Sequence, residues 1–388
     1  MRRHLLSLLF FAITSPTVAA TLYWDGSAGT SWADLENWTS ALSGGSTPAA
    51  VPAAADTVIF NADGFANALS TLGGAQAVTG MTFNGNASGG TTLGTLNDHA
   101  LTLGTGGLSL QSGAGAVTLN SSVVIGGVQV WNHQSSSTLT VAGNVALNNH
   151  LTLSGTGPVA ITGPITATGN RTLTLNGTGA ASVGDVSNPG TFVFSIAAGS
   201  SLDVNGVVSG SSVEKFGAGT VVFNGSNTHT GNLRVRDGTI VLNQSYTSSV
   251  QLIFGAANGS NGADGFGTLS LSKSDAAAVA LNLTGTVYVH NTSDGAQITS
   301  TGSGAFAPVV NLNGERIFMI RDVVPEADLR VSIGLANGSG IGVVTKRSLG
   351  VMLMEGDNTY TGATNVDRGR LILYYQLNNG DNKLSNTA

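Results

Sequence analysis

The chain has 388 residues, of which 55 are glycine, 9% are charged and none is cysteine. The lack of cysteine excludes a disulfide framework and a thiolate metal site, and an apolar content of 41% is too high for wholesale disorder. A net charge of −6 without a basic cluster argues against nucleic-acid binding.

Residues 1–20 have the pattern of a secretory signal peptide. Arg2 and Arg3 precede an apolar stretch from Leu5 to Ile13, and small side chains end the segment at Ala20. We expect cleavage after about Ala20 and export by the general secretory route into the periplasm and beyond the cell; the alternative is an N-terminal helix packed on the protein. After this segment the sequence contains no run of about 20 apolar residues, so it predicts no membrane-spanning helix.

Residues 21–62 contain three of the four tryptophans, Trp24, Trp32 and Trp38. One interpretation is a carbohydrate-stacking platform. The favoured interpretation is a cap, because the first coil of a solenoid exposes an apolar face and a strand edge that something bulky must cover.

Residues 63–388 are dominated by short runs in which aliphatic side chains alternate with hydroxyls. Such alternation predicts strands with one buried face, and Gly or Asn after nearly every run supplies a turn. The clearest runs are 101–103, 139–141, 151–153, 173–175, 202–204 and 269–271. The sequence contains no helical periodicity of useful length, so the pattern predicts an all-β fold.

One spacing indicates how these strands are arranged. The segments 151–157 and 173–179 match, and the interval between them is a natural circumference for one coil of a three-sided solenoid. A β-sandwich would also give many short strands but would not require this fixed rhythm. We therefore predict a right-handed, single-stranded parallel β-helix with aliphatic side chains stacked from coil to coil.

The strictest repeat links residues 215–242 with residues 346–373. Every matched position is displaced by the same interval, that from Lys215 to Lys346, without a gap. A gap-free copy with glycines at fixed offsets indicates a repeated structural unit. The shared positions that we expect to shape it are Gly219, Gly225, Asn227, Thr228, Thr230, Gly231 and Gly238 in the first copy and Gly350, Gly356, Asn358, Thr359, Thr361, Gly362 and Gly369 in the second.

Both copies resemble the autotransporter-associated β-strand repeat family, through the signature Gly-x-Asn-Thr-x-Thr-Gly and the closing Gly-x-aliphatic-aliphatic-Leu. The resemblance implies a bacterial secreted or surface protein with a parallel β-helix. In such proteins the repeat is thought to help the passenger cross the outer membrane and fold. The second copy departs from the usual glycine-rich start at Arg347 and Ser348.

The central signature predicts a tight turn. Asn227 and Asn358 suit it because asparagine tolerates the left-handed conformation and can bond its own backbone. If φ is positive at Gly231 and Gly362, valine there should cost more than about 1 kcal/mol.

Three other groups of residues are candidate sites. Residues 259–266 nearly match a calcium-binding nonapeptide, but a single copy favours a plain loop. The charged segment 314–330 could supply a carboxylate pair for polysaccharide cleavage; the favoured alternative is the charged outer face of a strand with surface ion pairs. The scattered histidines lack metalloprotease spacing. We expect no catalytic residues, no cofactor and no metal.

The sequence therefore predicts a secreted or cell-surface structural passenger protein that uses outer-membrane export machinery and presents an adhesive surface to a polysaccharide or an extracellular matrix. The alternatives are a β-helical lyase or glycosidase and a carbohydrate-binding protein. Asn378 to Ala388 supply neither an anchor nor a cap, so we expect either a fragment or a protein anchored elsewhere, with a C-terminal edge that favours self-association.

Overall fold

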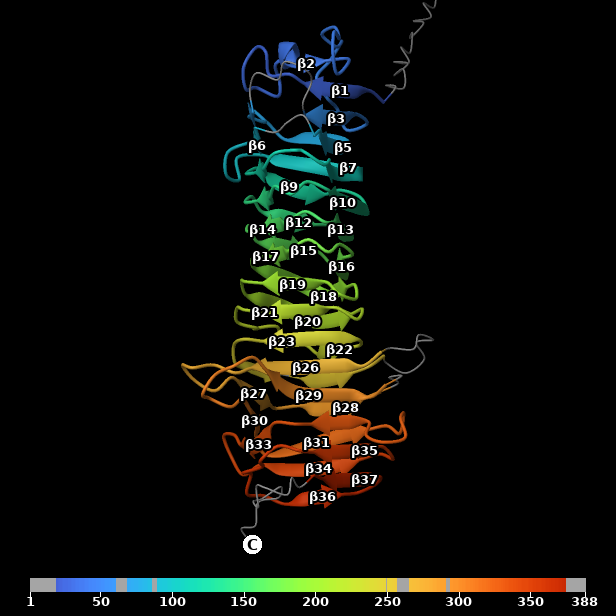
Figure 1. Cartoon of the computed structure of the whole chain (residues 1–388), viewed down its shortest axis with the longest axis vertical. Coiled ribbons are helices and arrows are strands. Elements are labelled where there is room, and N and C mark those ends of the chain that lie inside the picture. Colours follow the sequence, from blue (N-terminus) through green and yellow to red (C-terminus); the bar gives the residue numbers. More distant parts are fainter. Residues whose placement is uncertain are drawn as a thin grey trace, which may run out of the picture.

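The computed structural model describes residues 19–60, 68–85, 89–248, 250–256, 265–290 and 294–374. These residues form one elongated column with successive coils stacked from the N-terminal to the C-terminal end (Figure 1). Nearly every strand pairs in parallel with the strand one coil away, so the fold is the predicted parallel β-helix. The signal peptide prediction and most of the calcium-like segment 259–266 lie outside the described residues.

One side of the column is a fourteen-stranded parallel sheet, about 60 Å long at the usual strand spacing. Its strands, from the N-terminal end, are β4 (Leu69–Ser70), β6 (Thr91–Leu93), β8 (Val117–Leu119), β11 (Leu139–Val141), β14 (Val159–Ile161), β17 (Ala181–Val183), β19 (Ser201–Val204), β21 (Thr220–Phe223), β23 (Gly238–Leu242), β26 (Gly267–Ser272), β29 (Ala296–Thr301), β32 (Leu329–Val331), β35 (Val351–Met354) and β37 (Arg370–Leu373).

A nineteen-stranded sheet forms the other sides. Long strands such as β18 turn a corner and pair with two different strands of the preceding coil. The members are β1 (Thr21–Trp24), β2 (Trp38–Thr39), β3 (Thr57–Phe60), β5 (Gln76–Phe83), β7 (Ala100–Leu110), β9 (Ser122–Ile125), β10 (Gln129–His133), β12 (Val145–Leu147), β13 (Leu151–Gly155), β15 (Ile165–Ala167), β16 (Arg171–Leu175), β18 (Val186–Ile196), β20 (Val208–Phe216), β22 (Leu233–Val235), β25 (Gln251–Phe254), β28 (Thr286–Val289), β31 (Glu315–Ile320), β34 (Val343–Arg347) and β36 (Thr364–Val366).

Aliphatic side chains fill the axis of the column in register. Leu151 of β13 pairs with Leu173 of β16, which confirms the interval predicted from the sequence. In the fourteen-stranded sheet, Val141, Ile161 and Val183 occupy equivalent positions in three successive coils, and all three are buried. Each such side chain contributes about 1.5–3 kcal/mol by leaving water.

The coil length is not constant along the column. One circuit leads from Val221 to its partner Ile240, whereas a much longer one leads from Leu252 to its partner Val287. The longer coils add loops and a four-stranded sheet. Its strands are β24 (Tyr246–Ser248), β27 (Ala280–Leu283), β30 (Val309–Leu312) and β33 (Gly334–Asn337).

The tryptophans pack together at the N-terminal end. β2 pairs antiparallel with β1, and the short 3-10 helix η1 (Leu35–Asn37) leads into it. The rings of Trp32 and Trp38 lie 4.8 Å apart edge to face, and Trp24 lies 5.1 Å from Trp38. All three rings are at most 1% exposed, so none offers a face to a sugar. Burial thus removes the carbohydrate-stacking interpretation of these three side chains.

Within the described residues, no helix is both long enough and apolar enough to cross a membrane.

Candidate functional site: the duplicated repeat

Each copy of the repeat closes into a complete short coil. In the first copy, β23 stacks directly on β21, with Val221 opposite Ile240. In the second copy, β37 stacks on β35 in the same way, with Met352 opposite Leu371. The unit is therefore a strand, one short circuit and a second strand paired with the first.

A buried lysine fastens each coil. The Lys215 side chain is fully buried, and its Nζ donates to the carbonyl oxygens of Phe216 at 3.0 Å, Asp237 at 3.1 Å and Gly217. Lys346 is also fully buried. Its Nζ makes the equivalent contacts in the second copy, to Arg347 at 3.0 Å, Ser348 at 2.8 Å and Arg368 at 3.1 Å. Each lysine thereby joins its own turn to the turn of the next coil.

The charge of these lysines is set by opposing effects. Burial lowers the pKa of Lys215 to about 8, and the charge of Asp237 acts against this shift. Burial likewise lowers the pKa of Lys346, against the charge of Asp328. The carbonyl oxygens favour the ammonium form because it offers three donors. At neutral pH Lys215 is therefore mostly charged and uses all three.

The glycine that opens the last strand of each copy has a left-handed backbone. φ is +68° at Gly238 and +74° at Gly369. The residue two positions after each lysine is also left-handed, with φ of +78° at Gly217 and +71° at Ser348. Glycine adopts this conformation readily, whereas serine does so at a cost. The departure noted in the second copy is therefore a strained position.

The remaining signature glycines are required by close approach of the neighbouring coil. A side chain at Gly231 would place its Cβ 2.3 Å from Ser212 Oγ, and one at Gly362 would place it 2.3 Å from Gly342 O. Neither glycine has positive φ, so the conditional prediction of a left-handed turn there is wrong. At Gly219, Gly225, Gly350 and Gly356 the nearest atom to an added Cβ would be a backbone atom of the neighbouring coil.

The asparagines and threonines of the signature bond to the preceding coil. Thr228 N donates to Val208 O at 2.8 Å, and Thr359 N donates to Leu335 O at 2.7 Å. Asn358 accepts from Leu335 N at 2.9 Å and donates to its own backbone at Gly356 O, at 3.1 Å. Self-bonding by asparagine is therefore present in the second copy. Neither Asn358 nor Asn227 is left-handed, contrary to expectation.

The last threonine of the signature in each copy also bonds to the preceding coil. Thr230 N donates to Gly210 O at 3.0 Å, and Thr361 N donates to Asn337 Oδ1 at 3.1 Å. Coil-to-coil bonds, rather than a turn closed on itself, thus explain the signature.

The position between the threonines holds a buried ring in both copies. His229 is 3% exposed, and its Nε2 lies 2.8 Å from the Tyr246 hydroxyl. Tyr360 is 1% exposed, and its hydroxyl lies 2.5 Å from Thr364 Oγ1. Burial lowers the pKa of His229 to about 4. The neutral imidazole is therefore part of the core at physiological pH.

On the outer surface, one pair of equivalent positions makes a different type of contact in each copy. In the first copy the guanidinium of Arg236 lies 5.1 Å from the centre of the Phe216 ring. In the second copy the same two positions hold Asp367 and Arg347, which form an ion pair at 2.9 Å. Different side chains thus join the same two neighbouring coils.

The charged segment 314–330 places one of its carboxylates inside the column. Asp328 is fully buried, with Oδ1 accepting from Val323 N and Val324 N at 2.6 and 2.9 Å and Oδ2 from Val351 N at 2.6 Å. The expectation of an outer-face charge is wrong for this residue, because it caps backbone donors inside the column. No group of three or more His, Asp or Glu side chains is placed to hold a metal in the part of the chain that the structure describes.

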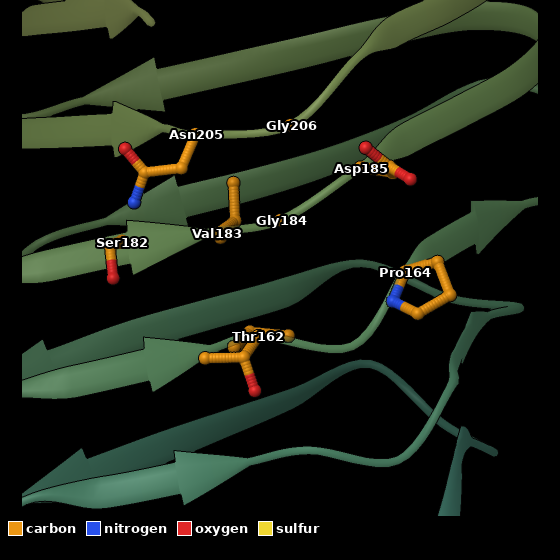
Figure 2. A pocket seen from close by; sticks show the side chains of 9 residues that line it. Thr162, Pro164, Ser182, Val183, Gly184, Asp185, Asn205 and Gly206 are labelled. Atoms are coloured by element: carbon orange, nitrogen blue, oxygen red, sulfur yellow. The ribbon is translucent and has the colours of Figure 1, made fainter. Parts of the chain in front are cut away.

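A furrow of about 300 Å³ lies between turns that follow β14, β17 and β19 (Figure 2). Of the described residues that line it, Asp185 alone carries a charge, and its Oδ1 accepts from Val207 N at 2.7 Å. The furrow therefore lacks the pair of carboxylates that glycoside cleavage requires.

Lys215 and Lys346 are matched positions of the two copies in the sequence, but the pattern does not predict that they fasten the coil. The signal that could have found them is their charge, since two lysines recurring at equivalent places in a charge-poor core need partners.

Comparison with protein families gives two matches. The sequence model of the passenger-associated-transport-repeat matches residues 213–242 and 344–373, the two coils just described. Comparisons with curated proteins and with solved structures find no match. Residues 213–242 and 344–373 thus match the passenger-associated-transport-repeat, in agreement with the family resemblance that the sequence signature indicated.

Proposed function

We propose that this protein is exported by its N-terminal segment and works outside the cell as a rigid passenger. Its repeats support export and folding, and its long sides present an adhesive surface. The observation that carries the proposal is the self-closure of each repeat, in which β21 pairs with β23 and β35 with β37.

Self-closure makes the repeat suited to start folding. The paired strands are separated by one short coil, so the entropy cost of closing that coil is small for a parallel sheet. A closed coil then offers a complete strand edge on which the next coil forms. During export through a narrow pore, a folded coil cannot slip back, and movement is biased outwards.

Export of variant chains tests this role. Lys346→Met removes the donor to three carbonyl oxygens and should slow closure of the second repeat. We expect a smaller fraction of the chain beyond the outer membrane, measured by protease accessibility on intact cells. The matched control is Val141→Ala, which destabilises a coil outside the repeats. Equal export losses for two variants of equal stability would contradict a specific role for the repeat.

A further inference from the structure

The coils become longer towards the C-terminal end of the column. Circuits between β25 and β34, such as that from Leu252 to Val287, are longer than those between β10 and β25, such as that from Gln129 to Leu151. The added residues form the four-stranded sheet and loops beside the fourteen-stranded sheet. Long loops on a rigid scaffold are the usual place for recognition.

A groove of about 790 Å³ lies at this side of the column, along the ends of β29, β32, β35 and β37. This volume is within the range of ligand sites in proteins. The residues that give it chemical character are Lys273, Ser300, Ser332, Glu355, Asp357 and Tyr374. We call it the β29–β37 groove.

One wall of the β29–β37 groove is fixed by hydrogen bonds between two loops. Lys273 N donates to Thr301 O at 2.8 Å, and Phe306 N donates to Ser274 O at 3.0 Å. Ala305 N also donates to Asp275 Oδ1 at 2.9 Å. A wall formed before binding spares the ligand the cost of ordering it.

The floor repeats along the axis. Backbone bonds run from Glu355 N to Val331 O at 2.8 Å and from Tyr374 N to Met354 O at 3.0 Å, so Ser332, Glu355 and Tyr374 lie one above another in three successive coils. Successive coils are spaced by about 4.8 Å along the axis, and this spacing is comparable to the length of one sugar unit along a polysaccharide chain. The groove thus presents one set of contacts per ring to a linear oligomer.

We propose that the β29–β37 groove binds a linear, uncharged polysaccharide. The Tyr374 side chain is 50% exposed and can stack on the apolar face of a sugar ring. Asp357 and Glu355 can accept hydrogen bonds from sugar hydroxyls, while Ser300 and Ser332 can donate or accept.

The charges at the groove also favour a neutral chain. Glu355 is paired with Arg330 at 3.6 Å, and Asp357 and Lys273 both line the groove. Two carboxylates are thus matched by two basic groups, so the surface offers no excess of one sign to a polyanion or a polycation.

This inference rests on the proposed adhesive role and is tested on the purified full chain, where export plays no part. Calorimetry would use cellohexaose, laminarihexaose and mannohexaose as neutral probes, with hexagalacturonate as the anionic one. We expect binding of at least one neutral hexamer, weakened at least tenfold by Tyr374→Ala and by Asp357→Asn. Tyr23→Ala, which changes a partly exposed tyrosine of β1 at the far end of the column, is the matched control and should bind normally.

Three results would overturn the inference: no binding of any neutral hexamer, equal binding by Tyr374→Ala and the unchanged chain, or attachment only to a collagen-coated surface. Any of these, together with normal delivery of the chain to the cell exterior, would leave the role of the repeats in export standing. Loss of export in the lysine variant would conversely leave the calorimetry unaffected.

Discussion

His229 is a neutral imidazole enclosed beside Tyr246. Its pKa is about 4 in the folded state, below the ordinary value of 6.5, so between these two values the unfolded chain binds the proton more readily. The contribution of neutral His229 to the free energy of unfolding is therefore complete above pH 6.5. As the pH falls towards 4, this free energy decreases by roughly 2–3 kcal/mol.

Urea unfolding at pH 7 and pH 4.5 measures this loss. In His229→Phe the decrease in unfolding free energy between the two pH values should be smaller by about that amount. His133 and His290, whose pKa values burial also lowers, retain their own contributions in both proteins. Parallel pH profiles for the variant and the unchanged chain would disprove the assignment.

Ser348 has a backbone conformation that glycine holds in the other copy. Ser348→Gly should raise the unfolding free energy by about 0.5–1 kcal/mol, since relief of the left-handed strain exceeds the added freedom of the unfolded chain. Gly217→Ala, at the equivalent position, should instead lower it by more than about 1 kcal/mol. Thermal unfolding of both variants checks the pair, and a destabilised Ser348→Gly would be inconsistent with strain at this site.

Two glycines of neighbouring coils separate the effect of crowding from that of backbone freedom. At Gly362 a Cβ would meet Gly342 O at 2.3 Å, whereas at Gly340 nothing lies within 4 Å, and neither has positive φ. Gly362→Ala should cost about 1–3 kcal/mol by overpacking. Gly340→Ala should be neutral or slightly stabilising. Equal denaturation midpoints for the two variants would mean that the coils can move apart.

At the scale of the element, we expect the two buried lysines to stabilise the fold independently. Each should cost roughly 2 kcal/mol on replacement by methionine, because three buried carbonyl oxygens lose their donor. The double variant Lys215→Met, Lys346→Met should lose the sum within about 0.5 kcal/mol, because the two sites lie in separate coils and share no partner. Denaturant unfolding of the three variants tests this, and strong coupling would argue against separate fastening units.

The elements also show how far sequence reasoning reaches. Alternating aliphatic residues and the interval from Leu151 to Leu173 predicted the parallel fold and its register, because one period determines both burial and stacking. The same pattern could not predict the longer coils at β25 to β34, since their loops follow no period. It also missed the Lys215 contacts, which are made to carbonyl groups and leave no side-chain partner to find in the sequence.

At the scale of the molecule, a coil should be a removable unit. Deleting residues 151–172 brings Leu173 into the place of Leu151 above Gln129, with aliphatic side chains still facing the axis. We expect a folded column shorter by about 4.8 Å in small-angle scattering. Deleting only 151–161 removes half a circuit and should abolish the cooperative transition. Loss of folding in both deletions would show that this coil is not interchangeable with its neighbours.

The direction of the hydrogen bonds has a mechanical consequence. In every sheet they run along the column, and β1 and β37 lie towards its opposite ends (Figure 1). Tension applied between these ends would load the interstrand hydrogen bonds of one coil at a time, so the terminal coils would detach one after another. The short coils that are fastened by lysine would then resist unfolding more strongly, because three contacts to carbonyl oxygens must break together.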